Sequence, residues 1–360
     1  MNPIDIRHAL HRIPELAFHE HETQAFIRNL LDEWKVLVRP IADTGLLATW
    51  NRGGNAPYRL FRADMDALPL QEATGAPFSS IYPDRMHACG HDVHMAVLLG
   101  VIRRVVDSGI SGNLLFLFQP SEEAGGGAER TIPDLRNYDI AEAWAMHVTD
   151  EYPLGMVVSC PGLLFASCLE LDCRFRGKSA HAAFHEQGRD AIPGCSELLD
   201  SVYRRNWDGD IVRFGRISGG RVRNVVADEC TLFGTIRTKS RDRCQSVTDE
   251  IVETAKEIAG RRQLNFEHVI GARYPEVRVN QSLFTAFEKI VPVTRCEMKY
   301  TGEDFGFFSL RWPSLMFWFG TRLPDQPANG LHHPGFLPPD EAVNNAIDVF
   351  WKIMTAETHI

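Results

Sequence analysis

The sequence predicts an α/β protein of two domains, in which an α/β domain with a mixed, largely parallel sheet is interrupted by an inserted α+β domain. Three observations support this prediction. The chain has 360 residues, which is long for a single core. Helical and strand patterns alternate over the first 160 residues, as in α/β layers. From about residue 161 the strands instead alternate apolar and polar side chains, which is typical of a sheet with one face in water.

The first part of the chain contains the patterns of an α/β layer. A polar amphipathic segment comes first, and an apolar helical pattern begins near Asp92. The run at 113–118 is apolar enough for a buried central strand. In chain order we expect an amphipathic segment at about 3–35, strands at 44–50 and 58–62, the helix after Asp92, the strand at 113–118 and, after a polar connection, a short strand at 143–148.

The inserted part has a different order of elements. Residues 169–175 alternate apolar and polar side chains, as expected of a strand with one wet face. After it we expect a helix at about 189–205, strands near 211–217 and 229–238, a helix at about 242–260 and a strand near 264–271. This β-α-β-β-α-β order is ferredoxin-like. We therefore expect one domain formed by residues 1–160 and 273–360, ending in a helix from about residue 340, and an inserted domain at 161–272.

Charge and composition exclude several classes of partner. The formal net charge of −9 disfavours a nucleic-acid partner, because such proteins usually present a basic surface. No apolar run approaches the length needed to span a membrane, and the start of the chain lacks the apolar core of a signal peptide. The eight cysteines are scattered, without the spacing of a disulfide scaffold. We therefore expect a cytoplasmic protein without nucleic-acid or membrane partners.

Residues 87–94, His-Ala-Cys-Gly-His-Asp-Val-His, hold a thiol, three imidazoles and a carboxylate. Cys89 and His91 are two positions apart and would lie on different faces of a regular helix. They can approach one ion only if this stretch is a loop or an irregular helix entry. The helical apolar pattern starts just after it, so a chelating loop followed by a helix is the simplest interpretation. A reduced cysteine beside polar loop histidines is the alternative.

Four more polar clusters come from other parts of the chain, and most follow predicted strands. In open α/β sheets, ligands bind beyond the carboxyl ends of the strands. Each cluster also has an ordinary explanation: turn-forming aspartates, an exposed acidic turn, a core histidine, or histidines that cap a turn. Five independent accidents of this kind are improbable. The clusters are Asp64 with Asp66, Glu122 with Glu123, His147, and His332 with His333.

This set of side chains restricts the metal chemistry. Thiolate, imidazole and carboxylate together favour zinc and other divalent transition metals over magnesium or calcium. Five candidate ligands are too many for one tetrahedral ion with an open position, but they suit two ions about 3.5–4 Å apart. Glu122 and Glu123 could then divide two roles, one binding metal and the other acting as general base. The spacing does not decide which does which.

The clusters, in this order, resemble the M20 metallopeptidase family, in particular its amidohydrolase branch. The resemblance covers essentially the whole chain, and its most specific motifs are residues 87–94 and Arg-Ala-Asp-Met-Asp-Ala-Leu-Pro at 62–69. It implies two divalent transition-metal ions, Zn²⁺ or else Mn²⁺, Co²⁺ or Ni²⁺. It also implies that Glu122 is the base and that Asp64 and Asp66 orient the ligands. The implied ligands are Cys89, His91, Glu123, His147 and His332.

By the same resemblance the inserted domain is a lid that can also form a homodimer. His181 in Gly-Lys-Ser-Ala-His would stabilise the oxyanion. Asn224 and Arg237 would hold the substrate carboxylate, although a surface salt bridge is an alternative for Arg237. The segments at 184–186 and 190–192 differ from the family pattern, which leaves the substrate range open.

The resemblance implies hydrolysis of the amide bond of small N-acyl amino acids, with N-acetyl compounds first. Deacetylation of N-acetyldiaminopimelate is the first alternative, and it requires room for a second zwitterionic centre. A dipeptidase or carboxypeptidase is next. Outside the enzymes, a silent family member that binds acyl-amino acids and a redox-sensing thiol protein built on Cys89 remain. Metal analysis would separate these.

Overall fold

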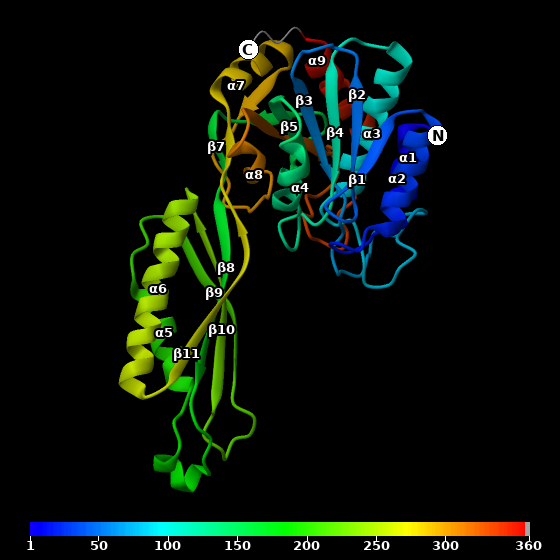
Figure 1. The fold of residues 1–360 in the computed structure, drawn as a ribbon. Coiled ribbons are helices and arrows are strands. Elements are labelled where there is room, and N and C mark those ends of the chain that lie inside the picture. The colour runs from blue at the N-terminus through cyan, green and yellow to red at the C-terminus, as the bar shows by residue number, and fades with distance from the viewer. Residues whose placement is uncertain (357–360) are drawn as a thin grey trace. The chain divides into compact units, whose positions relative to one another are not determined.

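The computed structural model describes residues 1–356 and divides them into two compact units. The larger unit consists of Met1–Leu164, Val277–Met298 and, of the described residues, 304–356. The inserted unit consists of Phe165–Glu276 and Lys299–Glu303. Figure 1 colours the chain by residue number, and residues 165–276 of the inserted unit appear in green to yellow. The expectation that residues 161–272 act as a lid and dimerisation domain concerns function and stays a prediction.

An eight-stranded sheet forms the centre of the larger unit, in the order β1-β2-β4-β3-β5-β14-β6-β13. Strands β4, β3, β5 and β14 run parallel to one another, and β13 runs parallel to β6. The pairs β1–β2, β2–β4 and β14–β6 are antiparallel. The predicted mixed, largely parallel sheet is confirmed. Its strands are β1 (Leu37–Ile41), β2 (Gly45–Asn51), β3 (Tyr58–Asp64), β4 (Asn113–Gln119), β5 (Ile140–Pro153), β6 (Val157–Ser159), β13 (Val293–Arg295) and β14 (Ser314–Arg322).

The helices of this unit pack on and beside the sheet. Helix α3 contacts both α1 and α9, and α2 contacts β1 and β2. The amphipathic segment expected at about 3–35 forms two helices. The helices are α1 (Pro3–His11), α2 (His21–Glu33), α3 (His91–Ser108), α4 (Gly127–Leu135), α7 (Gln281–Ile290), α8 (Gly306–Ser309) and α9 (Glu341–Thr355).

The predicted polar connection before β5 was wrong in part, because it contains α4. Two glycines precede this helix, a third is its first residue, and Pro133 lies inside it; glycine and proline normally mark a loop. Strand β1 was not predicted either. It is a five-residue strand with Pro40 in it, and it lies at the edge of the sheet, where proline is tolerated.

The centre of the sheet sets the position of the polar clusters. All seven residues of β4 are buried, as the apolar run predicted. Asp64 at the end of β3 pairs with Gln119 at the end of β4. The segments that follow these two parallel strands therefore start from the same edge of the sheet, which is where a ligand site is expected.

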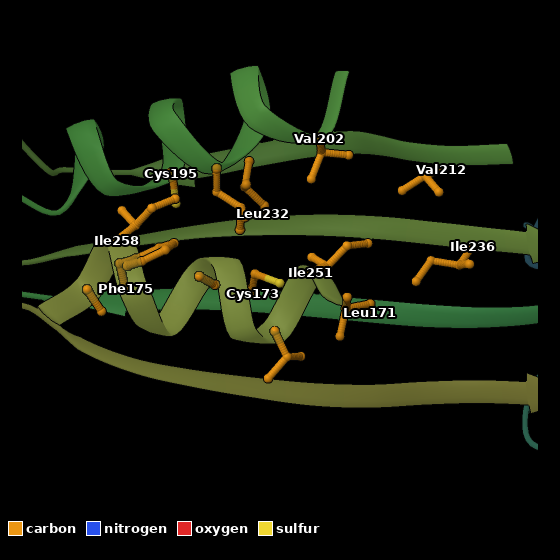
Figure 2. Packing of buried hydrophobic residues seen from close by; sticks show 14 of the residues in the cluster. Leu171, Cys173, Phe175, Cys195, Val202, Val212, Leu232, Ile236, Ile251 and Ile258 are labelled. Atoms are coloured by element: carbon orange, nitrogen blue, oxygen red, sulfur yellow. The ribbon is translucent and has the colours of Figure 1, made fainter. Parts of the chain in front are cut away.

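The inserted unit has the predicted element order β8-α5-β9-β10-α6-β11 and an antiparallel sheet ordered β11-β8-β10-β9. Helices α5 and α6 contact each other and the sheet, and their apolar side chains form a core with it (Figure 2). The elements are β8 (Ser167–Arg176), α5 (Ile192–Arg204), β9 (Ile211–Gly219), β10 (Glu229–Thr238), α6 (Arg241–Arg262), β11 (Asn265–Tyr274) and the 3₁₀ turn η1 (Ala182–Gln187).

Two short strands, β7 (Gly162–Phe165) and β12 (Val277–Val279), pair where the chain leaves and re-enters the larger unit. None of the helices in the described part of the chain combines the length and apolar character needed to cross a bilayer.

Candidate metal centre

The segment before α3 is a loop that ends in a sharp turn at Gly90. Gly90 has a φ of +82°, and a Cβ atom there would lie 2.3 Å from Cγ2 of Val148. Both the backbone conformation and the lack of space therefore require glycine. The helix begins at His91, so Cys89 lies in the loop and His91 in the first turn. This is the irregular helix entry that the two-residue spacing predicted.

The five predicted ligands come together at this point. Cys89 Sγ lies 3.3 Å from Nε2 of His147, and Nε2 of His332 lies 3.2 Å from Oε1 of Glu123. Nε2 of His91 lies 4.0 Å from the same Glu123 oxygen. Donor atoms lie within 4.8 Å of one another in each of three overlapping groups: Cys89, His91 and His147; Cys89, Glu123 and His332; and His91, Glu122 and Glu123.

Backbone carbonyls set the orientation of two of the imidazoles. Nδ1 of His91 donates to the carbonyl oxygen of Asp66 at 2.7 Å, and Nδ1 of His147 donates to that of Val148 at 2.7 Å. Each ring therefore keeps its Nε2 lone pair for another partner. Nε2 of His91 is buried and has no hydrogen-bond partner among the described residues. Metal-binding histidines are typically fixed in this way by their second nitrogen.

The charges around these atoms call for a cation. Burial raises the pKa of Cys89 well above its usual value, and Glu123 and Glu122 raise it further. Burial lowers the pKa of His91, but Asp64, Asp66 and Glu123 outweigh it and raise that pKa to about 10. A bound divalent ion would neutralise the two glutamates that disfavour the Cys89 thiolate and would displace the proton from His91, so that thiolate and neutral imidazole can both serve as ligands. Burial lowers the pKa of His147 to about 3, so its ring is neutral and able to ligate.

Asp66 holds the segment that carries both glutamates. Its Oδ1 accepts the backbone amide of Glu122 and its Oδ2 that of Glu123, each at 2.9 Å. Its carbonyl oxygen also accepts Nδ1 of His91. One residue thus positions two candidate ligands and the candidate base. On the other side of the segment, Oε1 of Glu20 accepts the amide of Ser121 at 2.9 Å.

Asp64 acts through the third histidine of the octet. Its Oδ1 lies 2.6 Å from Nδ1 of His94, and Nε2 of His94 accepts the amide of Val148 at 2.9 Å. Because both nitrogens of His94 are engaged, this ring supports the site rather than binding an ion. Oδ2 of Asp64 accepts Nη1 of Arg62 at 2.6 Å. Asp64 is fully buried, and His91, His94 and Arg62 overcome the effect of burial and lower its pKa well below the usual value.

Sequence reasoning missed the role of Asp304. Its carboxylate accepts Nη2 of Arg62 and Nε2 of Gln119, each at 2.9 Å, and the amide of Ala128 at 2.9 Å. Its own amide lies 3.4 Å from Oε1 of Glu122. The sequence signal here is that Thr-Gly-Glu-Asp-Phe at 301–305 resembles the Ser-Glu-Asp-Phe segment that lies near the site in the M20 family. Contacts between residues 62, 119 and 304 leave no trace in local spacing.

A second cluster of buried polar side chains surrounds Asp92 in the first turn of α3, and it was not predicted from the sequence. Asp92 accepts Nε of Arg7 at 3.1 Å and Nδ1 of His11 at 2.9 Å, and Nε2 of His11 lies 3.2 Å from Glu72. Nearby, His87 is buried without a hydrogen-bond partner among the described residues, and burial lowers its pKa to about 3. Arg7 and His11 come from helix α1, so this group ties the amino-terminal helix to the helix entry.

The remaining predicted site residues belong to the inserted unit. His181 is exposed at the start of η1, where its Nδ1 accepts the amide of Ala183 at 3.1 Å. Asn224 is exposed, and its backbone carbonyl oxygen accepts the backbone amide of Ala182 at 2.9 Å. These two residues are therefore neighbours. Arg237 is half-buried and donates from Nη1 to the carbonyl oxygen of Tyr300 at 2.7 Å.

The donor set of the larger unit fits divalent transition-metal ions. It combines one sulfur, three imidazoles and a carboxylate, with a second carboxylate at Glu122 beside them. All eight cysteines of the chain are free, so Cys89 is available as a thiolate ligand. A paired-ion site of this kind can polarise a carbonyl group and activate water.

Comparison with known proteins agrees with this interpretation. Residues 60–356 match the model of peptidase family M20/M25/M40. The chain is 38% identical to an N-acetyldiaminopimelate deacetylase of Bacillus pumilus, over 96% of this chain and 95% of that one. It is 36% identical to the N-acetyldiaminopimelate deacetylase of Bacillus subtilis, over 96% of both chains.

A solved structure is similar as well. The YXEP protein of Bacillus subtilis, described as a dinuclear metal-binding peptidase of the M20 family, superposes with a TM-score of 0.82. The two chains are 28% identical, and the match covers 98% of this chain and 96% of the other.

Proposed function

Because this chain belongs to peptidase family M20/M25/M40, we propose that its metal centre removes the acetyl group of N-acetyldiaminopimelate. The enzyme is a metal-dependent amidohydrolase that acts on N-acyl amino acids. Motif resemblance alone placed N-acetyldiaminopimelate behind simpler N-acetyl amino acids. Relatives with 34–38% identity over nearly the whole chain carry this activity in their names, which is why it comes first here.

One observation carries the proposal: five donors from four separate segments meet beside Glu122. Cys89 and His91 belong to the helix entry, Glu123 to the segment after β4, His147 to β5 and His332 to the carboxyl-terminal loop. We assign these five as ligands of two divalent ions, with Zn²⁺, Mn²⁺, Co²⁺ and Ni²⁺ as the candidates. Bound ions of this kind supply a Lewis acid and lower the pKa of water.

Glu122 is the residue to which we assign proton transfer. It is buried, and the contact between its amide and Asp66 fixes its backbone. A general base held in this way can take a proton from the attacking water and return it to the leaving amine. In the inserted unit we assign oxyanion stabilisation to His181 and binding of the substrate carboxylate to Asn224 and Arg237. Asp64 and Asp66 orient the ligands.

The test of the base is Glu122→Gln, which keeps the shape of the side chain and removes its basicity. We expect the variant to retain its metal, measured by elemental analysis, and to lose at least about 100-fold in kcat. Glu129→Gln, at an exposed position in the first turn of α4, is the matched control. Turnover by Glu122→Gln close to that of the control would remove the assignment.

The test of the substrate is a hydrolysis screen with chelator-treated enzyme reloaded with each candidate ion. N-acetyldiaminopimelate, N-acetyl derivatives of common amino acids and dipeptides would be compared by kcat/KM. We expect activity only with added metal, and the highest value with N-acetyldiaminopimelate. A preference for dipeptides would favour a peptidase, and binding of metal without any hydrolysis would favour a silent family member.

Two further expectations accompany this function. We propose that the protein acts in the cytoplasm, since all eight cysteines are free thiols. We also propose a homodimer formed through the inserted unit, which exposes apolar side chains on its strands, among them Ile217, Val269 and Ile270. Light scattering of the purified protein tests the second expectation.

A further inference from the structure

A polar pocket of about 170 Å³ lies at the carboxyl end of the large sheet. We call it the Arg322 pocket. A single water needs about 10–15 Å³ of such space, so the pocket has room for a small organic group. Among the residues that line it are Thr74, Asp150, Thr321, Arg322, Gln326 and Asn329. All of them belong to the larger unit.

The pocket is built by two of the segments that carry candidate ligands. His147 pairs with Trp318 in the register of β5 and β14, and Asp150 lies three residues further along β5. At a rise of about 3.3 Å per residue, the Cα atom of Asp150 is therefore about 10 Å from the Cα atom of His147 along the strand. Thr321 and Arg322 occupy the corresponding end of β14.

The loop that carries His332 forms another wall. Asp150 accepts the amides of Asn329 and Gly330 through its Oδ2, at 2.6 and 3.0 Å. The side-chain amide of Asn329 closes the loop by donating to the carbonyl oxygen of Gly335 at 2.8 Å. The pocket thus adjoins the strand of one candidate ligand and the loop of another.

The charged groups of the pocket are one cation and one anion. The guanidinium of Arg322 makes no hydrogen bond or ion pair within the part of the chain that the structure describes, which is unusual for a half-buried arginine. A free guanidinium binds a carboxylate with two parallel hydrogen bonds. Asp150 accepts the two loop amides mainly through Oδ2, and its Oδ1 makes only a longer contact of 3.3 Å with the Gly330 amide. With about four acceptor positions on a carboxylate, it can still accept from an ammonium group.

We infer that the Arg322 pocket binds a second zwitterionic centre of the substrate, an α-ammonium and α-carboxylate pair at the far end from the acylated amine. Arg322 holds the carboxylate and Asp150 the ammonium. This inference rests on the proposed function, because a substrate is placed here only if its acyl group is cleaved at the metal centre. It makes the Arg322 pocket the site that selects a diamino diacid over an ordinary amino acid.

The first experiment uses the wild-type enzyme and three substrates. N-acetyldiaminopimelate has both distal charges, N-acetyl-2-aminopimelate has only the distal carboxylate, and N-acetylnorleucine has neither. We expect kcat/KM to fall in this order, each step by about tenfold or more, since each removes a hydrogen bond to a charged group. Equal values would overturn the inference and leave the proposed function intact. Hydrolysis of none of the three would instead contradict the proposed function.

The second experiment changes the pocket. Arg322→Gln should lower the ratio of kcat/KM for N-acetyldiaminopimelate to that for N-acetylnorleucine by about tenfold or more, chiefly through KM. Arg322→Lys keeps the charge but loses the paired geometry, and should restore part of the ratio. Arg104→Gln, at an exposed ion pair on α3, is the control. A ratio unchanged in Arg322→Gln, or an equal loss with both substrates, would overturn the inference.

Arg322 is a sharper position to test than Asp150. Any change at Asp150 also removes acceptors from the amides of Asn329 and Gly330, and so disturbs the loop of His332. Should Arg322→Gln fail to fold, inhibition of the wild-type enzyme decides the question. Free diaminopimelate should inhibit at a concentration at least about tenfold lower than norleucine does, and equal inhibition would count against the pocket.

Discussion

Arg62 and Asp304 form a buried ion pair in which Nη2 and Oδ1 lie 2.9 Å apart and neither side chain is exposed. The pair joins the end of β3 to a segment 242 residues later in the chain. Asp304 also accepts from Gln119 and from the amide of Ala128 at the start of α4. The strand ends that carry the metal centre are therefore connected by one carboxylate.

Removing that carboxylate should be costly. In Asp304→Ala, Arg62 keeps Asp64 as a partner but loses half of its neutralisation, and two further donors lose their acceptor. We expect the free energy of unfolding to fall by about 3–5 kcal/mol, measured by urea denaturation. Asp325→Ala, at an exposed position, is the control and should change it by less than about 0.5 kcal/mol. A similar small change in Asp304→Ala would show that the pair is not needed for stability.

The carboxylate of Asp66 should control metal affinity. In Asp66→Asn one of the two acceptor oxygens becomes an NH₂ group that faces a backbone amide donor of Glu122 or Glu123. The segment that carries both glutamates then has to move. We expect metal affinity to fall by about 10–100-fold, as measured by competition with a chelator. Asp325→Asn serves as the control, and an unchanged affinity would mean that Asp66 does not position the glutamates.

Gly127 limits how the same segment can be altered. A Cβ at this position would lie 1.7 Å from the carbonyl oxygen of Pro120, which is backbone and cannot yield. Gly127→Ala should therefore shift residues 120–127 and reduce both activity and stability, the latter by about 1–3 kcal/mol. Gly260→Ala is the matched control, because a Cβ there would have no atom within 4 Å and the residue is in helix α6. That change should stabilise the protein by a few tenths of a kcal/mol up to about 1 kcal/mol.

The buried histidine on α1 should make stability depend on pH. Burial lowers the pKa of His11, but Asp92 and Glu72 outweigh burial and raise it from 6.5 to about 9. Arg7, on the same helix, and His87 also face this group. A group whose pKa is raised in the folded state stabilises that state fully at pH values below its pKa in the unfolded chain. For His11 this stabilisation is lost as the pH rises through about 9. We expect His11→Gln to lower the free energy of unfolding more at pH 6.5 than at pH 9.5.

Urea denaturation at both pH values measures this effect. His21→Gln, at the exposed first position of α2, provides the control for loss of a histidine as such. An equal loss for His11→Gln at the two pH values would indicate that the ring contributes through packing against Phe78 and not through its charge.

The fold was predictable where side-chain periodicity is strong. The apolar run of β4 and the alternation of β8 each identified a strand to within two residues. The ferredoxin-like order followed from the spacing of the inserted elements. Helix α4 was not predictable in the same way, because glycines and a proline dominate its local signal and its stability comes from tertiary contacts.

The candidate site was predictable to the extent that ligands bind beyond the carboxyl ends of the strands in an open α/β sheet. Clusters after β3 and β4 and on β5 were expected to meet, and the structure brings their donors together. Glu122 and Glu123 could not be told apart by spacing, and their assigned roles stay predictions. The supporting residues were missed for a physical reason. Arg62, Gln119 and Asp304 depend on hydrogen bonds between distant segments, and a single sequence carries no record of such contacts.

The dispersion of the donors along the chain has a thermodynamic consequence. Only Cys89 and His91 are close in sequence, and the others lie at positions 123, 147 and 332. An unfolded chain cannot gather them, so divalent ions bind the native state far better than the denatured ensemble. Each tenfold rise in free ion concentration above the dissociation constant then adds about 1.4 kcal/mol per ion to the free energy of unfolding. For this enzyme, the supply of metal would determine the stability of the folded state as well as the rate of turnover.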